Sequence, residues 1–116
     1  MSGDKETIEF LSTHEVWRDI QGYEGLYQVS SFGRVRGLDR VIECKNGSKK
    51  AIKGQVLKQT ENHSGYLDVN LSKRRHYTSF RVHRLVAATF LDREDYQDRV
   101  NHKDENKQNN NVANLE

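Results

Sequence analysis

The stretch WRDIQGYEGLYQVSSFGRVR, residues 17–36, decides the fold of this chain because it predicts a tight β-hairpin. Residues 26–30 read as one strand, residues 31–33 as a turn, and residues 34–38 as the returning strand. Arginine alternates with apolar residues in the returning strand, so one face can pack inward while Arg34 and Arg36 point outward. The aromatic residues of the stretch are expected to fill a small core, because large aromatic side chains dominate such cores.

A second hairpin is predicted further along the chain. Leu67, Val69 and Leu71 alternate with polar residues, which indicates a half-buried strand, and the alternation resumes over residues 77–82. The tip between these strands is basic, because it holds Lys73, Arg74 and Arg75. Two-stranded ribbons fit the major groove of DNA, so a basic tip of this kind favours contact with phosphates over a role in solubility alone.

The remaining elements are predicted less directly. A strand is expected over residues 51–58, and a short helix over residues 83–91, where the apolar residues form a stripe. Residues 1–14 are expected to form a flexible leader with a short helical tendency, and the last fifteen residues, rich in Asn, Asp and Lys, to be loop or disordered. The fold class is therefore α+β, built from antiparallel β-hairpins with a short helix.

Charge is distributed unevenly along the 116 residues, although the net charge is only +2. Residues 30–84 carry thirteen basic and four acidic side chains, whereas the segments on both sides are net acidic. A basic middle region indicates a surface that meets a polyanion, and nucleic acid is the obvious candidate. The single cysteine, Cys44, excludes an internal disulfide and a cysteine-based zinc site. The sequence has no apolar run of membrane-spanning length, so no membrane contact is expected.

Two motifs carry a resemblance to a known family. Residues 17–36 resemble the N-terminal module that accompanies many phage HNH endonucleases. VHRLVAATFL (residues 82–91) and VNHKDENKQNNNVANLE (residues 100–116) resemble the signature of phage and intron HNH homing endonucleases. Together the matches reach from Trp17 to Glu116, nearly the whole chain, so the resemblance is specific.

The resemblance implies a ββα-metal nuclease region over residues 81–116, preceded by a basic, β-rich DNA-binding module over residues 15–80. It implies His102 as general base, Asn114 as a catalytic residue that holds the loop and orients the histidine, and Asn101 as a ligand of Mg²⁺ or Mn²⁺. A neutral histidine can activate a water, and hard cations prefer oxygen ligands. His83 belongs to the same pattern and is expected to pack or cap, and Asp104 to form a turn.

The expected partner is double-stranded DNA, bound by a monomer in the cytoplasm, with a phage-encoded protein in a bacterial host as the implied setting. The residues expected to contact DNA are Arg34, Arg36, Lys73, Arg74, Arg75, Arg81 and Arg84.

The chain departs from the family pattern at its end. The third signature residue, on a closing helix, would lie beyond Glu116, so the nuclease motif is expected to be incomplete and cleavage by this chain alone weak or absent. The main hypothesis is a metal-dependent DNA endonuclease. A DNA-binding protein without cleavage is the alternative, and an RNA-binding β module is a weaker third.

Overall fold

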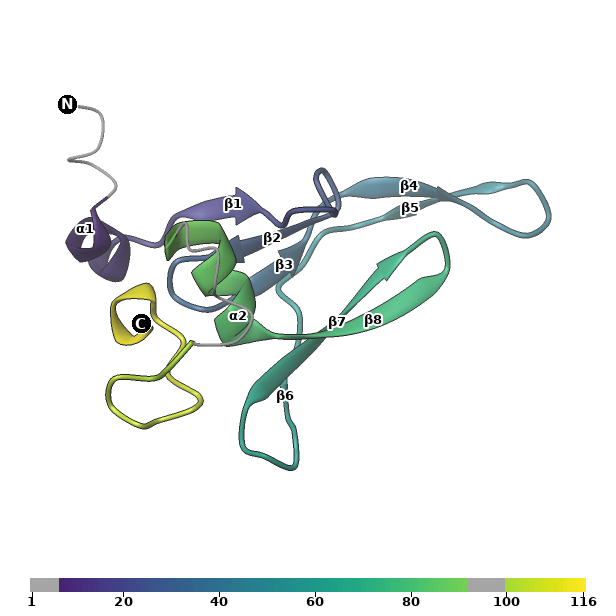
Figure 1. The fold of residues 1–116 in the computed structure, drawn as a ribbon. Coiled ribbons are helices and arrows are strands. Elements are labelled where there is room, and N and C mark those ends of the chain that lie inside the picture. The colour runs from purple at the N-terminus through teal and green to yellow at the C-terminus, as the bar shows by residue number, and fades with distance from the viewer. Residues whose placement is uncertain (1–6, 92–99) are drawn as a thin grey trace.

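The structure is a computed structural model that describes residues 7–91 and 100–116. Helix α1 (Ile8–Thr13) comes first, and the rest of the described chain is mostly antiparallel strand (Figure 1). The strands are β1 (Trp17–Asp19), β2 (Tyr27–Ser30), β3 (Val35–Gly37), β4 (Arg40–Glu43), β5 (Lys49–Ile52), β6 (Thr60–Glu61), β7 (Leu67–Lys73) and β8 (His76–Arg81). Helix α2 (Val82–Val86) runs into a π-helical turn, η2 (Ala87–Leu91), and a 3₁₀ turn, η3 (Val112–Asn114), lies near the end of the chain.

The first predicted hairpin is confirmed as strands β2 and β3, with β1 added on the other side of β2. The turn between β2 and β3 is closed by the Ser30 hydroxyl, which accepts hydrogen bonds from the backbone N–H groups of Phe32 and Arg34. Gly33 in this turn has φ +92°, a conformation that side chains disfavour. Of the aromatic residues, Tyr27 is buried, while Trp17 and Tyr23 are half-buried.

The second predicted hairpin is confirmed as β7 and β8, and a short strand β6 pairs with the outer side of β7. Lys73 lies opposite His76, which leaves Arg74 and Arg75 as a two-residue turn. Both arginines have positive φ angles, 51° and 68°, as a type I′ turn requires. Asparagine and glycine adopt this conformation more easily than arginine does, so the basic tip carries local backbone strain.

Strands β4 and β5 pair only with each other and form a two-stranded ribbon that projects from the body (Figure 1). The strand expected over residues 51–58 is therefore wrong in its bounds. It ends at Ile52, because the chain then turns back beside β3: Gly37 N donates to the carbonyl of Gln55, and Leu57 N to that of Val35.

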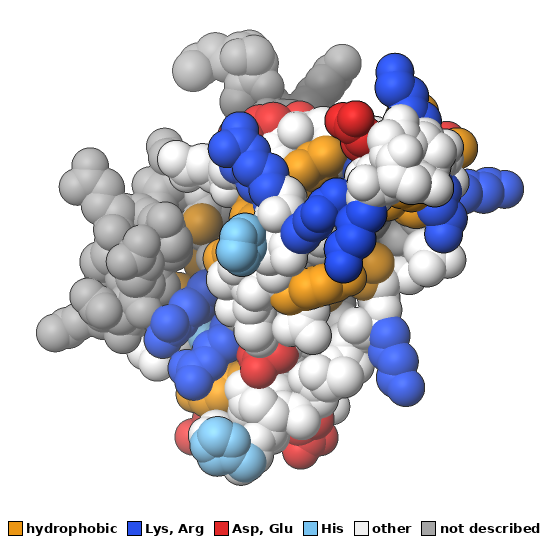
Figure 2. All heavy atoms as spheres, turned by 90° about the vertical axis from the view of Figure 1, so that its right-hand side faces the viewer, with side chains coloured by type: hydrophobic (Ala, Val, Ile, Leu, Met, Phe, Trp, Pro, Cys, Tyr) orange, Lys and Arg blue, Asp and Glu red, His pale blue; other side chains and the backbone are white. Residues whose placement is uncertain are grey.

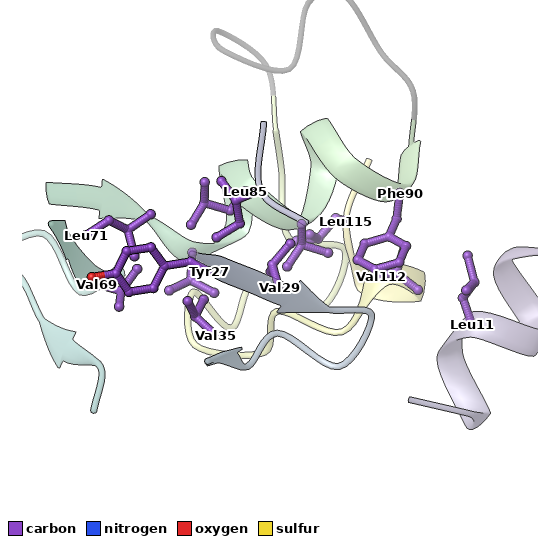
Figure 3. Close-up of a cluster of buried hydrophobic side chains, with 13 residues drawn as sticks. Leu11, Tyr27, Val29, Val35, Val69, Leu71, Leu85, Phe90, Val112 and Leu115 are labelled. Atoms are coloured by element: carbon purple, nitrogen blue, oxygen red, sulfur yellow. The ribbon is translucent and has the colours of Figure 1, made fainter. Parts of the chain in front are cut away.

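One buried apolar cluster holds the described chain together. Side chains from the sheet, from helix α2 and from the C-terminal segment meet there (Figure 3). Its members include Val29, Val35, Leu71, Leu85, Phe90, Val112 and Leu115. The two regions expected on either side of residue 80 therefore share one core, which fixes their relative position.

The structure corrects part of the expectation for each end of the chain. Residues 8–13 of the expected flexible leader form helix α1, and its Leu11 is buried because it packs beside η3 (Figure 3). The last fifteen residues are mostly loop, as expected, but this loop is packed rather than disordered: Val112 and Leu115 are buried, and the Asn111 amide donates to the carbonyl of Ser12. A polar composition hid this packing, because a few apolar residues anchor a segment whose amides bond to the chain itself.

Within residues 7–91 and 100–116, no helix has both the length and the apolar character needed to cross a membrane.

Candidate active site

His102 lies on a short strand-like pairing formed by the two ends of the C-terminal segment. It forms an isolated antiparallel bridge with Leu115. On both sides of this bridge the backbone pairs again: Asn101 exchanges hydrogen bonds with Glu116, and Lys103 N donates to the carbonyl of Asn114 at 2.7 Å. Because Leu115 is buried in the core, the pairing fixes the backbone of His102 to the body of the protein.

The ring of His102 is held by Asn110. The Nε2 atom of His102 lies 2.7 Å from Oδ1 of Asn110, whose side chain is 4% exposed. An amide oxygen only accepts hydrogen bonds, so this contact requires the ring hydrogen to sit on Nε2. The other ring nitrogen, Nδ1, is then unprotonated in the neutral ring, and its lone pair can accept a proton.

Asn114 holds the loop rather than the histidine ring. Its Nδ2 donates to Asp104 Oδ1 at 2.9 Å and to the carbonyl of Asn109 at 2.8 Å, and its Oδ1 accepts from Asp104 N. The loop role predicted for Asn114 agrees with these contacts, whereas the contact to the His102 ring comes from Asn110. The sequence reasoning missed Asn110, although the run of three asparagines at residues 109–111 was a signal that could have found it.

Asp104 is a turn residue, as expected. Its carboxylate accepts hydrogen bonds from Asn106 N and from the side chains of Asn109 and Asn114. These donors hold the pKa of Asp104 below its ordinary value, with the Asn109 amide as the largest cause. Three hydrogen bonds to this exposed carboxylate therefore shape the loop.

His83 forms the other wall of the site. Its ring is 3% exposed and stacks on Tyr66 at a centroid distance of 4.9 Å, and the His102 ring lies 5.0 Å away. Within the described chain, its Nδ1 has no hydrogen-bond partner. Burial lowers the pKa of His83 from 6.5 to about 4, and the nearby charges of His102 and Arg84 add to this shift. The expected packing role is confirmed, and the ring is neutral at physiological pH.

The burial of His83 predicts a pH-dependent stability. The unfolded chain binds a proton at this residue below about pH 6.5, whereas the folded chain does so only near pH 4, so stability is complete above pH 6.5 and falls between 6.5 and 4. Each pH unit is worth about 1.4 kcal/mol, for a total loss of at most ~3.5 kcal/mol. In urea unfolding across this range, His83→Phe should flatten the dependence, and the same change at exposed His76 should not. Equal slopes for wild type and His83→Phe would contradict this account.

The site is braced against the turn between β2 and β3. The carbonyl of buried Ser31 accepts a hydrogen bond from Val112 N at 2.9 Å. A Cβ atom added to Gly33 would lie 2.7 Å from Cβ of Asn110, closer than real Cβ atoms come. The first hairpin therefore sets the position of the asparagine that holds His102.

The residues around His102 supply little for a metal ion. Asn101 has an exposed side chain beside His102 and is free to offer its amide oxygen, whereas the Asp104 carboxylate is already engaged. No group of three or more His, Cys, Asp or Glu side chains suited to a metal exists in residues 7–91 and 100–116. One neutral oxygen falls short of the several oxygen ligands that Mg²⁺ requires, so the described residues do not form a complete metal site.

Arg34 and Arg36 both lie over the ring of Trp17, and they differ in their charge balance. Arg34 forms an ion pair with Glu15 that raises the pKa of the guanidinium, so its charge is compensated within the protein. Arg36 lies 4.1 Å from the ring centroid and donates to the neutral Gln28 amide, so its positive charge remains available.

The other basic residues expected to bind DNA lie in three places. Lys73 donates to the carbonyl of Gly22 at 2.7 Å, and Arg74 and Arg75 form the exposed tip of the β7–β8 hairpin. Arg81 lies over Tyr66, 5.2 Å from the ring centroid. Arg84 is exposed and lines a cleft of about 730 Å³ between helix α2 and the turn after β1, and His102 is not part of that cleft.

The described chain combines a basic hairpin module with a histidine-bearing strand pairing on one shared core, and comparisons with known proteins place this combination in a family. Residues 15–72 match the NUMOD4 motif, which is half of the chain, and the chain belongs to the NUMOD4 family. It is 43% identical over 101 residues to DNA endonuclease I-HmuI of Bacillus phage SP01, and 37% identical over 100 residues to an uncharacterized HNH endonuclease of Acanthamoeba polyphaga mimivirus. These matches use 85% and 86% of this chain.

A solved structure agrees with these relatives. This structure concerns DNA binding and cleavage by the HNH homing endonuclease I-HmuI. It matches 86% of this chain with a TM-score of 0.66 and 40% sequence identity. The resemblance and the fold class predicted from the sequence are confirmed. The chain spans 49% of the phage relative's length and 26% of the mimivirus relative's length.

Proposed function

We propose that this chain binds double-stranded DNA and hydrolyses its phosphodiester bonds, with His102 as the general base. The contact between His102 Nε2 and Asn110 Oδ1 carries this proposal. It holds the ring by one nitrogen and leaves Nδ1 as the proton acceptor. Water attacks phosphorus while its proton passes to Nδ1, and the bond from phosphorus to the leaving sugar oxygen breaks.

Two neighbours support this role for His102. The ring of His83, 5.0 Å away, is neutral at physiological pH and therefore places no positive charge beside the His102 ring. Asn114 fixes the loop that carries Asn110, because its amide bonds to both Asp104 and the backbone of Asn109. The catalytic role of Asn114 is therefore one of positioning.

The proposed cofactor is a divalent cation, Mg²⁺ or Mn²⁺, with Asn101 as one ligand. Such an ion, when bound, supplies positive charge that stabilises the charge developing on the phosphate and the leaving oxygen. The exposed amide of Asn101 is adjacent to His102 and suits a hard cation, although it is one ligand of the several needed.

The proposed DNA-binding residues are the seven arginines and lysines predicted from the sequence. Arg74 and Arg75 are the best supported, because they keep exposed guanidinium groups in a backbone conformation that costs energy. Strain of this kind is tolerated where the residue serves a function. Arg34 is the least available, since Glu15 neutralises it. We propose a monomer acting in the cytoplasm of a bacterial host.

Nicking of a supercoiled plasmid tests this function. We expect slow conversion to the open-circular form with Mn²⁺ or Mg²⁺ and none with a chelator, because the described site offers few metal ligands. An anisotropy titration with a labelled duplex measures binding separately. If the chain shows no nicking and also no salt-sensitive duplex binding, the proposal is overturned.

A DNA-binding protein without cleavage is the second candidate. The engaged Asp104 carboxylate and the incomplete set of metal ligands in the described residues favour it. Duplex binding without any metal-dependent nicking would support this candidate over the first.

A further inference from the structure

The β4–β5 ribbon leaves both of its faces uncovered by the described chain. Val41 is 66% exposed and Ile42 is 39% exposed, although β-branched residues in sheets are usually packed against a neighbouring layer. A two-stranded ribbon is only marginally stable by itself, so exposed apolar residues on it call for an explanation outside the fold.

The ribbon is nevertheless held in a fixed direction. At its base, Gly54 N donates to Asp39 Oδ1 at 2.6 Å, and Arg40 Nη2 donates to the hydroxyl of Tyr27. A Cβ at Gly54 would lie 2.4 Å from the carbonyl oxygen of Gly37, so the two chain segments cross at close range. At the tip, Asn46 Oδ1 accepts from both N–H and hydroxyl of Ser48. An arm ordered in advance loses little entropy when it binds a partner.

Four lysines in and next to the β4–β5 ribbon make no polar side-chain contact within the described chain. They are the exposed residues Lys45, Lys49, Lys50 and Lys53. In the described part of the chain, none of their side-chain ammonium groups forms an ion pair or donates a hydrogen bond. Lys73 and Lys107, by contrast, both donate to backbone carbonyls. The lysines of the ribbon therefore remain available to an anionic partner.

The register of the ribbon separates its two faces. Ile42 lies opposite Lys50 and Arg40 opposite Ile52, so these four side chains share one face, which is basic and apolar. Glu43 lies opposite Lys49 on the other face, together with Val41. A face without acidic residues suits a groove edged by phosphates, where apolar side chains can contact thymine methyl groups.

The ribbon and the β7–β8 tip project from the same side of the molecule (Figure 1). Viewed from that side, the surface shows more Lys and Arg side chains than acidic ones (Figure 2). We propose that the β4–β5 ribbon is a second arm that contacts the duplex alongside the Arg74–Arg75 tip. This inference rests on the DNA binding proposed above and extends it to ribbon lysines that are not among the seven DNA contacts predicted from the sequence.

The test is the salt dependence of duplex affinity. Replacing all four lysines by glutamine (K45Q/K49Q/K50Q/K53Q) should weaken binding to a duplex of about 30 base pairs by ~10-fold or more at ~100 mM KCl. Each lost phosphate contact makes the negative slope of log affinity against log salt concentration shallower by about 0.9. The slope of the glutamine variant is therefore expected to be shallower by roughly two or more. The charge-preserving variant K45R/K49R/K50R/K53R should bind like wild type, which separates charge from folding, and circular dichroism checks that each variant is folded.

The outcomes are distinct. If the wild-type protein binds the duplex and the glutamine variant shows the same salt slope, the ribbon has no role in binding. The proposed function then still stands. A single-stranded RNA that competes as well as the duplex would also overturn it, because the arm would then not be specific to duplex DNA. Wild type that binds no duplex would overturn both proposals.

Discussion

Replacement of His102 by alanine is expected to lower metal-dependent plasmid nicking by about 100-fold or more while duplex affinity stays within a few-fold of wild type. General-base catalysis contributes roughly 10²–10⁴ to a rate, and no other described side chain near the Asn110 contact is placed to replace it. His83 cannot substitute, because its ring is buried and Nδ1 faces no solvent. The measurement is the initial rate of open-circle formation with Mn²⁺ under enzyme excess.

A matched histidine controls for contamination and general damage. His63 is exposed in the turn after β6, and His63→Ala should nick at the wild-type rate. Nicking by His102→Ala at that same rate would remove His102 from the mechanism. Nicking lost together with duplex affinity would point instead to a structural role for the residue.

Replacement of Gly33 by alanine is expected to destabilise the protein by ~3 kcal/mol or more. The φ of +92° costs an alanine about 1–2 kcal/mol. The added Cβ would in addition lie 2.7 Å from Cβ and 2.9 Å from the backbone oxygen of Asn110, so the loop behind His102 must shift. Urea unfolding at neutral pH measures the change in the free energy of unfolding.

Gly47→Ala is the matched control for this substitution. Its φ is +83°, yet nothing lies within 4 Å of the place that the new Cβ would take on the ribbon tip, so it should cost about 1 kcal/mol for the backbone alone. Equal losses for the two variants would mean that the turn does not brace Asn110. A larger loss for Gly33→Ala supports the link between the first hairpin and the site.

The hairpins could be predicted from the sequence because their information is local. Alternation in residues 67–71 and the turn at residues 31–33 specify strand, turn and facing direction without reference to distant residues. Helix α1 could not be predicted as packed, because the burial of Leu11 depends on a segment about a hundred residues later. The packing of the C-terminal loop could not be predicted for the same reason, since Val112 and Leu115 are buried against residues of the sheet and of helix α2.

The candidate site was predicted in part. The family resemblance singled out the histidine His102, its neighbour Asn101 and Asn114 as candidates, and the structure places Asn114 in the loop beside them. The contact from Asn110 could not be assigned, since three successive asparagines are equivalent in the sequence and only the folded loop distinguishes them. Likewise, alternation correctly turned Arg34 outward, but its pairing with Glu15 joins residues that precede β3 and β1, the two strands on either side of β2.

The central claim is that Asn110 holds Nε2 of His102 as a hydrogen-bond donor and leaves Nδ1 as the base. Nitrogen-15 NMR of the imidazole rings, with selective labelling of histidine, tests it most directly and needs neither metal nor DNA. We predict a protected N–H signal on Nε2 of His102 above neutral pH, which is lost to exchange in Asn110→Ala and unchanged in His63→Ala. A ring hydrogen on Nδ1 in wild type, or an Nε2 signal indifferent to Asn110, would contradict the account.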